Sequence, residues 1–487
     1  MAGIAGLIGE GASPEVLRGM LDTLKHRGPD DRWMVDGTSH AIGVCDSDLS
    51  PEKGTGHAGG GDLAVVFDGE IYNDRPVGTS DASVAIELYK TYGRTFAAHL
   101  HGAFACAIWH HGQLILARDG VGIRPLYWGR NDNGAVCFAS EIKALVGKAG
   151  DVQELHPATV FSSDTGIQAY LPVYPDVAVS DGVDEAKKAL HDLLFLATER
   201  RLADGAVGGM LLSGGLDSSI IAAIANQIKP GLPAFTVGIE GAPDLANAEL
   251  MARHLGVEHQ VKLFGAEEVK VLIPKAVYSL ESFDEDCVSG AIANLVASEL
   301  AFTRTNCILS GEGGDELNGG YHLLKDLPDD ASRRKMMEQL IAVAYNTALQ
   351  RLDRAMMGNS INYRTPFLDS EVTAFCLQIP VDWKVHKQPD GQLVEKWLLR
   401  EAFKDMLPEE IYRREKLRFS GGTGTDPLIE EMGREIIEEG AFTEDSRQTP
   451  GGYMLNSPKE LAYYRLFKEY FPDPAFESLV GRWDPEK

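Results

Sequence analysis

The sequence lacks any run of apolar residues long enough to span a bilayer, and no signal-peptide pattern opens the chain. It also lacks internal repeats and long low-complexity linkers. Its hydrophobic content of 44% and charged content of 24% are typical of globular proteins. We therefore expect a cytoplasmic protein without a membrane partner, and the length of 487 residues predicts two or three domains.

Cysteine is scarce, and its six positions are widely spaced. They lie at 45, 106, 137, 287, 307 and 376, without CxxC spacing or histidine partners. This pattern excludes a structural zinc site and a disulfide framework. It predicts reduced cysteines in the core of a cytosolic protein.

Positive charge is also in short supply. Lysine and arginine number 46 against 72 aspartates and glutamates, which gives a formal net charge of −26. Such a balance argues against nucleic acid or an anionic membrane as a partner. Any site for ATP must then be locally basic, or contain a metal ion.

One nine-residue segment in the middle of the chain carries a specific signal. Residues 211–219 read Leu-Leu-Ser-Gly-Gly-Leu-Asp-Ser-Ser, between an apolar run at 207–212 and a helix-forming run at 220–225. A strand, a glycine turn and a helix start would point backbone N–H groups and a helix dipole at a phosphate. Asp217 would repel that phosphate unless a divalent cation lies between them. The alternative is a close-packed turn without a ligand.

This segment resembles the pyrophosphate-binding loop of the ATP pyrophosphatases, enzymes that cleave ATP between the α and β phosphates. It is not a Walker loop, because no Gly-Lys-Ser/Thr follows. The resemblance implies ATP and Mg²⁺ as cofactors. It places the following residues at the phosphates: Leu211, Ser213, Gly214, Gly215, Asp217, Ser218 and Ser219.

The first 175 residues are predicted to form a layered α+β sandwich. One amphipathic helix is expected over 82–92. Short strands separated by glycine, proline and Asn/Asp turns are expected at 3–8, 63–67, 103–109, 113–117 and 136–139.

A second resemblance spans the whole chain, to asparagine synthetase of the glutamine-hydrolysing type. It rests on five segments: residues 1–6, His26-Arg27-Gly28-Pro29-Asp30, Gly69-Glu70-Ile71-Tyr72-Asn73, 118–127 and Ser140-Glu141-Ile142-Lys143. It implies an N-terminal-nucleophile glutaminase at 1–175. An α/β ATP-pyrophosphatase domain with a parallel sheet and a helical C-terminal part would follow at 180–487.

The glutaminase site departs from the family pattern. The family's catalytic cysteine is Ala2 here, so no acyl-enzyme can form. Its oxyanion-hole Asn-Gly is Asp68-Gly69, its glutamine-binding arginine is absent from 43–49, and the segment before the ammonium-binding aspartate, Asp81, is short. An engineered change could explain Ala2, but several losses at one site favour natural degeneration. Cys45 could be a relocated nucleophile; a core cysteine is the favoured interpretation.

The synthetase half contains the other predicted site residues. Val237 and Gly238, at the end of an apolar strand, would contact adenine; the alternative is a plain core strand. In residues 307–316 the resemblance implies Ser310 and Gly311 at the nucleotide, and Asp315 holding magnesium together with Asp217. Glu312 would be the base for the attacking amine; the alternative is a solvated acidic loop.

Lys416 matches a family lysine that neutralises the α-phosphate and pyrophosphate. A glycine-rich flap is expected behind it at 419–424. Helices are predicted at 336–352, 393–407 and 428–438, and the segment 364–369 is interpreted as structural.

The acceptor substrate is less determined. Residues 285–290 lack the arginine and threonines of asparagine-forming members, and Glu285 and Asp286 favour an amine-bearing substrate or a differently bound acid. With Ala2, this resembles the β-lactam and carbapenam synthetases, which however have tyrosine in place of Glu312.

Four functional hypotheses therefore stand. The favoured one is an amide synthetase that joins a small carboxylic acid to ammonia or an amine without glutamine hydrolysis. The others are an intramolecular lactam-forming synthetase, a glutamine-dependent asparagine synthetase with an engineered Cys-to-Ala change at position 2, and a silent scaffold paralogue. A homodimer is kept as a hypothesis.

Overall fold

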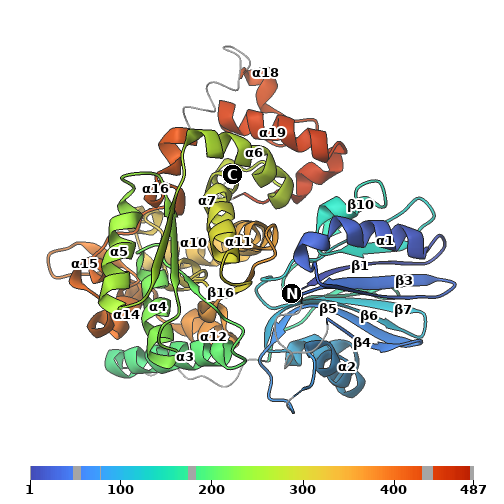
Figure 1. Cartoon of the computed structure of the whole chain (residues 1–487), viewed down its shortest axis with the longest axis horizontal. Helices are drawn as coiled ribbons and strands as arrows, with labels where there is room; N and C mark the ends of the chain where they lie inside the picture. The colour runs from blue at the N-terminus through green and yellow to red at the C-terminus, as the bar shows by residue number, and fades with distance from the viewer. Residues whose placement is uncertain (1, 48–55, 77, 174–181, 430–441, 483–487) are drawn as a thin grey trace.

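The computed structural model describes residues 2–47, 56–76, 78–173, 182–429 and 442–482. Its N-terminal part, called here the N-terminal sandwich, contains two packed antiparallel sheets (Figure 1). The first sheet, in spatial order, consists of β10 (Gly150–Glu154), β8 (Tyr127–Arg130), β9 (Val136–Ala139), β1 (Ala2–Ile8), β3 (His40–Asp46) and β2 (Asp31–Asp36). The second consists of β12 (Gly166–Ala169), β11 (Thr159–Ser162), β7 (Gln113–Arg118), β6 (Gly102–His110), β5 (Leu63–Ile71) and β4 (His57–Gly60).

A helix covers the outer face of each sheet, so the sandwich has four layers. Strand β5 illustrates the arrangement, because side chains alternate between the two faces of a sheet. Ala64 and Val66 join the core between the sheets, whereas Val65 and Phe67 pack against α2 (Asp81–Tyr92). Helix α1 (Pro14–Thr23) covers the first sheet in the same way. The predicted α+β sandwich is confirmed.

The C-terminal part, called here the parallel-sheet region, is built on one five-stranded sheet. The strands run parallel in the order β15 (His259–Leu263), β14 (Ala234–Gly238), β13 (Met210–Leu211), β16 (Cys307–Leu309) and β17 (Asn362–Arg364). The strand order reverses at β13, which lies between β14 and β16. A switch point of this kind opens a crevice at the carboxyl ends of the strands, where ligands bind.

Helices surround this sheet and form the rest of the region (Figure 1). They are α3 (Val183–Leu202), α4 (Leu216–Ile228), α5 (Pro243–Leu255), α6 (Ala266–Leu280), α7 (Glu285–Phe302), α8 (Gly314–Asn318), α9 (Leu323–Asp326), α10 (Asp330–Val343), α11 (Ala348–Met357), α12 (Ser370–Gln378), α13 (Val381–Lys384), α14 (Trp397–Phe403), α15 (Glu409–Tyr412), α16 (Phe419–Gly422), α18 (Glu444–Arg447) and α19 (Pro458–Tyr470). The predicted parallel α/β fold with a helical C-terminal part is confirmed.

Three boundaries differ from the sequence prediction. The helix predicted at 336–352 is broken between α10 and α11, where Tyr345 turns to donate a hydrogen bond to His156 or accept one from it, at 2.9 Å. The first residues of the segment 393–407 form strand β19 (Leu393–Glu395), which pairs with β18 (Val385–Lys387) across an Asp390-Gly391 turn. The predicted strand at 207–212 is only two residues long. A Cβ at Gly208 or Gly209, just before it, would collide with Thr305 or Phe235. Most of the helix predicted at 428–438 lies outside the described residues.

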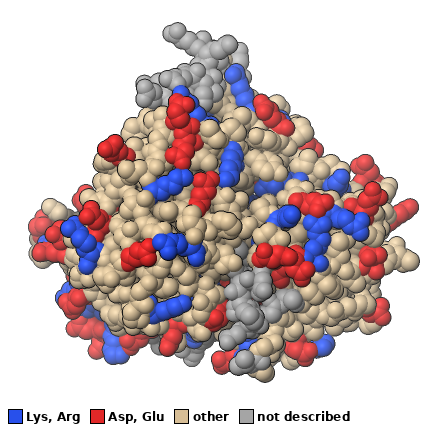
Figure 2. Space-filling model, viewed as in Figure 1, with Lys and Arg blue, Asp and Glu red and all other residues tan. Residues whose placement is uncertain are grey.

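The six cysteines are all buried as thiols, as predicted. Among the described residues, no helix combines the length and the apolar content needed to cross a membrane. Basic and acidic side chains are interspersed over the face shown in Figure 2. Positive charge on that face is therefore dispersed. Arg304–Glu258 and Arg413–Glu409 are examples of exposed ion pairs among the described residues.

Candidate active site

The glycine turn after β13 is organised as a phosphate-binding loop. Gly214 has φ +69°, and a Cβ there would collide with the backbone nitrogen of Ala248. Its neighbour Ser213 accepts a hydrogen bond from the Gly215 amide at 3.2 Å and lies 3.0 Å from the hydroxyl of Ser218. Helix α4 begins directly afterwards, so its free amides and dipole face the same crevice.

A single pocket at the carboxyl ends of β13, β14 and β16 collects most of the predicted site residues. Its lining includes Leu211, Ser213, Gly215, Asp217, Ser218, Val237, Ser310, Gly311, Glu312, Asp315 and Lys416. Three predicted residues, Gly214, Ser219 and Gly238, lie beside the pocket in the same turn, helix and strand and are not part of its lining.

Two lysines neutralise the aspartates of this pocket. The Lys396 ammonium lies 2.5 Å from Asp217 Oδ2 and 2.5 Å from Asp315 Oδ1, and it is almost completely buried. Lys416 pairs with the other oxygen of Asp315. The sequence prediction identified Lys416 but missed Lys396. Lys396 adopts φ +55°, and this backbone conformation cannot be read from sequence.

The carboxylates differ in their protonation behaviour because their environments differ. Burial raises the pKa of Asp217, and the nearby Asp315 adds to the effect, although Lys396 opposes it. Burial also acts on Asp315, but Lys396 and Lys416 outweigh it and lower the pKa of that carboxyl. The pKa of Glu312 is raised by burial, with Arg351 acting in the opposite direction. Burial and the negative charge of Glu312 raise the pKa of Glu316 to about 7.

Arg351 of helix α11 is a second pocket residue that sequence reasoning missed. It lines the pocket and donates a hydrogen bond to Glu312 Oε1 at 3.1 Å. A Cβ at Gly290 of α7 would lie 2.8 Å from Cδ of Arg351, so the absence of a side chain there leaves room for the arginine. The pairing restrains the side chain of Glu312 at the inner end of the pocket.

The segment that carries Lys416 is held at the pocket by contacts on either side of this residue in the sequence. Arg414 donates a hydrogen bond to the Gly214 carbonyl at 2.8 Å and pairs with Asp244. The Thr423 carbonyl accepts a hydrogen bond of 2.9 Å from the amide of Ile239, directly after β14. The glycine-rich segment at 419–424 therefore packs against the strand end where adenine is expected.

The oxygen atoms of Asp217 and Asp315 are suited to a hard cation. Among the described residues, no group of three His, Cys, Asp or Glu side chains is arranged to hold a metal ion alone. However, Asp217 Oδ1 is buried and accepts no hydrogen bond. Two protein carboxylates combined with phosphate oxygens are a usual ligand set for Mg²⁺. The residues present thus fit magnesium shared with a nucleotide.

Comparisons with known proteins agree on one family. The family model described as asparagine synthase matches residues 189–343 and 325–456, and the model of a glutamine amidotransferase domain matches residues 1–164. The chain belongs to the asparagine synthetase family. Asparagine synthetase [glutamine-hydrolyzing] 2 of Arabidopsis thaliana is 30% identical over 451 residues, covering 86% of this chain and 77% of that protein. Asparagine synthetase B of Escherichia coli is 30% identical over 454 residues, covering 85% and 80%.

A relative in Saccharomyces cerevisiae, asparagine synthetase 1, is 28% identical over 534 residues and aligns with 95% of this chain and 92% of its own. Those relatives are described as glutamine-hydrolysing. The glutamine amidotransferase model covers the part of the chain that contains the predicted glutaminase site.

Buried ion pairs occupy that site. Ala2 in β1 is buried, and its amide donates a hydrogen bond of 3.1 Å to Asp68 Oδ1. The other oxygen of Asp68 accepts from Arg27 at 2.9 Å. Asp81 pairs with Arg75 and accepts a hydrogen bond from the Ile71 amide at 3.3 Å. Gly69 has φ +139° beside the Ala103 carbonyl, where a side chain would not fit.

Cys45 has the environment of a core residue. Its thiol donates to the Leu21 carbonyl at 3.1 Å. Burial raises its pKa to about 11, so the reactive thiolate is almost absent at neutral pH.

The acidic pair at the start of α7 contacts the C-terminal segments. Glu285 accepts a hydrogen bond from Ser457 at 2.6 Å, and Asp286 pairs with Arg418 at 3.3 Å. Neither residue is part of the pocket lining. That these charges recognise an amine-bearing substrate stays a prediction.

Proposed function

We propose that this protein is an ATP-dependent amide synthetase that takes its nitrogen from free ammonia or an amine. It would adenylate the carboxylate of a small amino-acid-like acid and release AMP and pyrophosphate. One observation carries the proposal: the phosphate loop, two aspartates, two lysines and Glu312 converge in one pocket. In the N-terminal sandwich, meanwhile, Asp68 is paired with Arg27 and Asp81 with Arg75.

In the first half-reaction, a substrate carboxylate oxygen attacks the α-phosphorus, and the bond to the bridging oxygen of the β-phosphate breaks. The loop amides and Ser213 would hold the departing pyrophosphate, and Val237 and Gly238 would contact adenine. Lys416 supplies a positive charge where negative charge accumulates. Asp217 and Asp315 would hold Mg²⁺, which neutralises phosphate charge when it is bound.

In the second half-reaction, the amine nitrogen attacks the acyl carbon and AMP leaves with the carboxyl oxygen. The proton lost by the nitrogen must go to a base within reach. Glu312 is the candidate, because burial raises its pKa and makes it a better proton acceptor than an exposed carboxylate. Arg351 donates a hydrogen bond to Oε1 of Glu312. This contact orients the carboxylate and with it the second oxygen, which would accept the proton.

The proposed nitrogen source rests on positions 2 and 68. Ala2 has no nucleophile that could form an acyl-enzyme with glutamine, and the carboxylate of Asp68 is paired with Arg27. Residues 1–175 would thus form a degenerate glutaminase domain that supplies no nitrogen, and 180–487 the adenylating domain. Ala2, Asp68, Gly69 and Asp81 would be remnants of the lost activity.

A screen of small carboxylic acids tests this proposal. Purified protein is incubated with ATP, Mg²⁺ and each acid, with ammonium, a primary amine, glutamine or no nitrogen source, and AMP and pyrophosphate are measured. We expect acid-dependent pyrophosphate release and an amide product with ammonium or the amine, but no glutamate from glutamine. Turnover without any added nitrogen compound would indicate a lactam-forming enzyme, and no acid-dependent pyrophosphate across the screen would support a silent paralogue.

A further inference from the structure

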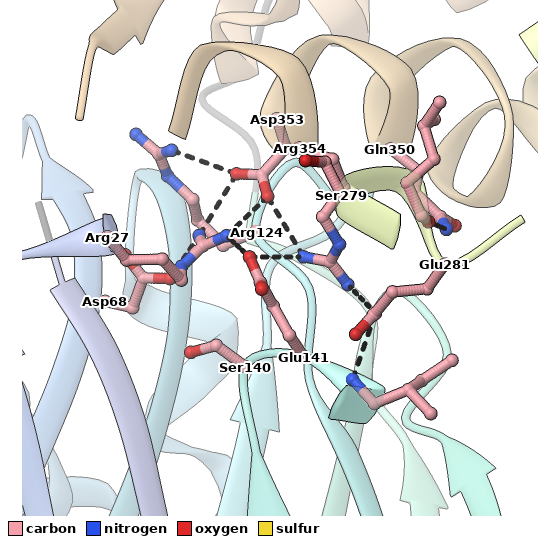
Figure 3. A network of polar contacts seen from close by, with 12 residues as sticks. Arg27, Asp68, Arg124, Ser140, Glu141, Ser279, Glu281, Gln350, Asp353 and Arg354 are labelled. Atoms are coloured by element: carbon pink, nitrogen blue, oxygen red, sulfur yellow. Dashed lines mark hydrogen bonds and ion pairs between the residues drawn. The ribbon is translucent and has the colours of Figure 1, made fainter. Parts of the chain in front are cut away.

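A network of buried charges joins the N-terminal sandwich to helix α11 (Figure 3). Arg27, at the end of a short 3₁₀ turn (Lys25–Arg27), donates to Asp68 at 2.9 Å, to Glu141 at 2.8 Å and to Asp353 of α11 at 2.7 Å. Asp353 also accepts from Arg124 at 3.3 Å. Each of these side chains is at most 1% exposed.

The charges of this network balance. Apart from His26, whose ring contacts Glu141 at 2.9 Å, its four cations are Arg27, Arg124, Lys143 and Arg354, and its four carboxylates are Asp68, Glu141, Glu281 and Asp353. Removing one partner of a buried ion pair leaves an uncompensated charge, which is far more costly than breaking an exposed pair. Asp68, the residue that replaces the family's asparagine, therefore supplies a charge that the network needs.

Helix α11 connects this network to the pocket. Successive helical residues are about 100° apart, so residues two positions apart lie on nearly opposite faces. Asp353 accordingly faces the sandwich, while Arg351 faces the pocket and pairs with Glu312. Arg354, the next residue of α11, pairs with Glu281 at 3.0 Å. The position of Arg351 is thus set partly by what Asp353 and Arg354 contact.

We propose that the N-terminal sandwich positions the amine side of the pocket, through Asp68, Arg27 and Asp353. Asp68 pairs with Arg27, and Arg27 pairs with Asp353 of α11. Helix α11 in turn positions Arg351 beside Glu312. These three are positioning residues, since none of them lines the pocket. The inference rests on the proposed function, because it assigns Glu312 to the amine half-reaction. It explains why a sandwich that supplies no nitrogen would still be required.

The near-isosteric change Asp68→Asn tests the link, because it restores the family residue and removes one charge. We expect kcat with ammonium to fall about tenfold, the effect of a small displacement of a positioned group. The KM for ATP should stay within about twofold, because the phosphate loop is on a different element. The matched control is Glu154→Gln, which breaks a buried pair of 2.7 Å with Arg118 inside the sandwich; it should change neither parameter beyond its effect on stability.

A double-mutant cycle separates positioning from stability. If Asp68 acts through Arg351, then Asp68→Asn and Arg351→Lys should be non-additive in kcat, since the second change removes what the first perturbs. Fully additive losses, or a kcat for Asp68→Asn that falls only as far as its folded fraction, would overturn the proposal. If Asp68→Asn does not fold, Asp353→Asn tests the same link, because it removes the partner of Arg27 on α11.

Amide hydrogen exchange in α11 tests the positioning proposal without a substrate. Asp68→Asn should accelerate exchange over residues 348–357, and Glu154→Gln should not. Equal exchange in both variants would overturn the inference even if the screen finds no substrate. Absence of acid-dependent pyrophosphate in the unmodified protein would instead count against the proposed function alone.

Discussion

Replacing Lys396 by methionine isolates the electrostatic role of the lysine that bridges the two site aspartates. The ammonium lies 2.5 Å from a carboxylate oxygen on each of Asp217 and Asp315, and its side chain is 2% exposed. Methionine keeps most of the volume and removes the charge. Breaking a buried pair by removing one partner costs about 3–5 kcal/mol, and we expect a loss near the lower end, about 3 kcal/mol, because Lys416 remains beside Asp315.

Urea unfolding with and without magnesium measures this loss. The variant exposes two carboxylates to a competing cation, so Mg²⁺ should stabilise it more than the unmodified protein. At a concentration a hundredfold above its dissociation constant, the ion contributes about 2.7 kcal/mol. The control is Lys325→Met, which removes a pair with Glu395 at 2.6 Å and leaves both aspartates untouched. Equal stability of Lys396→Met and the unmodified protein, or an equal response of both to magnesium, would refute the reasoning.

Four further predictions concern single residues. Lys416→Ala should abolish acid-dependent pyrophosphate release and leave the circular dichroism spectrum unchanged; normal turnover would remove it from the mechanism. Asp217→Asn should abolish magnesium-dependent ATP cleavage, and an active variant would mean that the metal is held elsewhere. Ala2→Cys alone should release no glutamate from glutamine, because Asp68 remains paired with Arg27. Measurable glutamate would indicate that the alanine is an engineered change. Burial raises the pKa of Asp284 from 3.8 to about 6, so its protonated form is favoured on folding. Its contribution is complete below pH 3.8 and is lost as pH rises through 6, about 3 kcal/mol in all, and Asp284→Asn should flatten this part of the stability profile in urea titrations.

The local features of the site could be predicted from the sequence because short-range geometry creates them. Ser213, Gly214 and Gly215 lie between strand β13 and helix α4. Asp217 follows in the first turn of α4, so the order of the elements alone places amides and a carboxylate at one turn. The strand at 63–67 could be predicted from its composition. The burial of all six cysteines could be predicted from their residue type and spacing. Helix breaks and strand ends were predicted less well, because contacts such as that of Tyr345 with His156 join residues far apart in the chain.

Tertiary structure alone decided which charges meet. Lys396 reaches Asp217 across 179 residues of sequence, and Arg27 reaches Asp353 across 326. Nothing in the local sequence of either lysine or arginine identifies its partner, because a buried ion pair depends on how whole elements pack. The sequence by itself determined a phosphate loop, a family and an alanine at position 2. The packing of α11 between the sandwich and the pocket determined that Asp68 is linked, through Arg27, to the helix that carries Arg351.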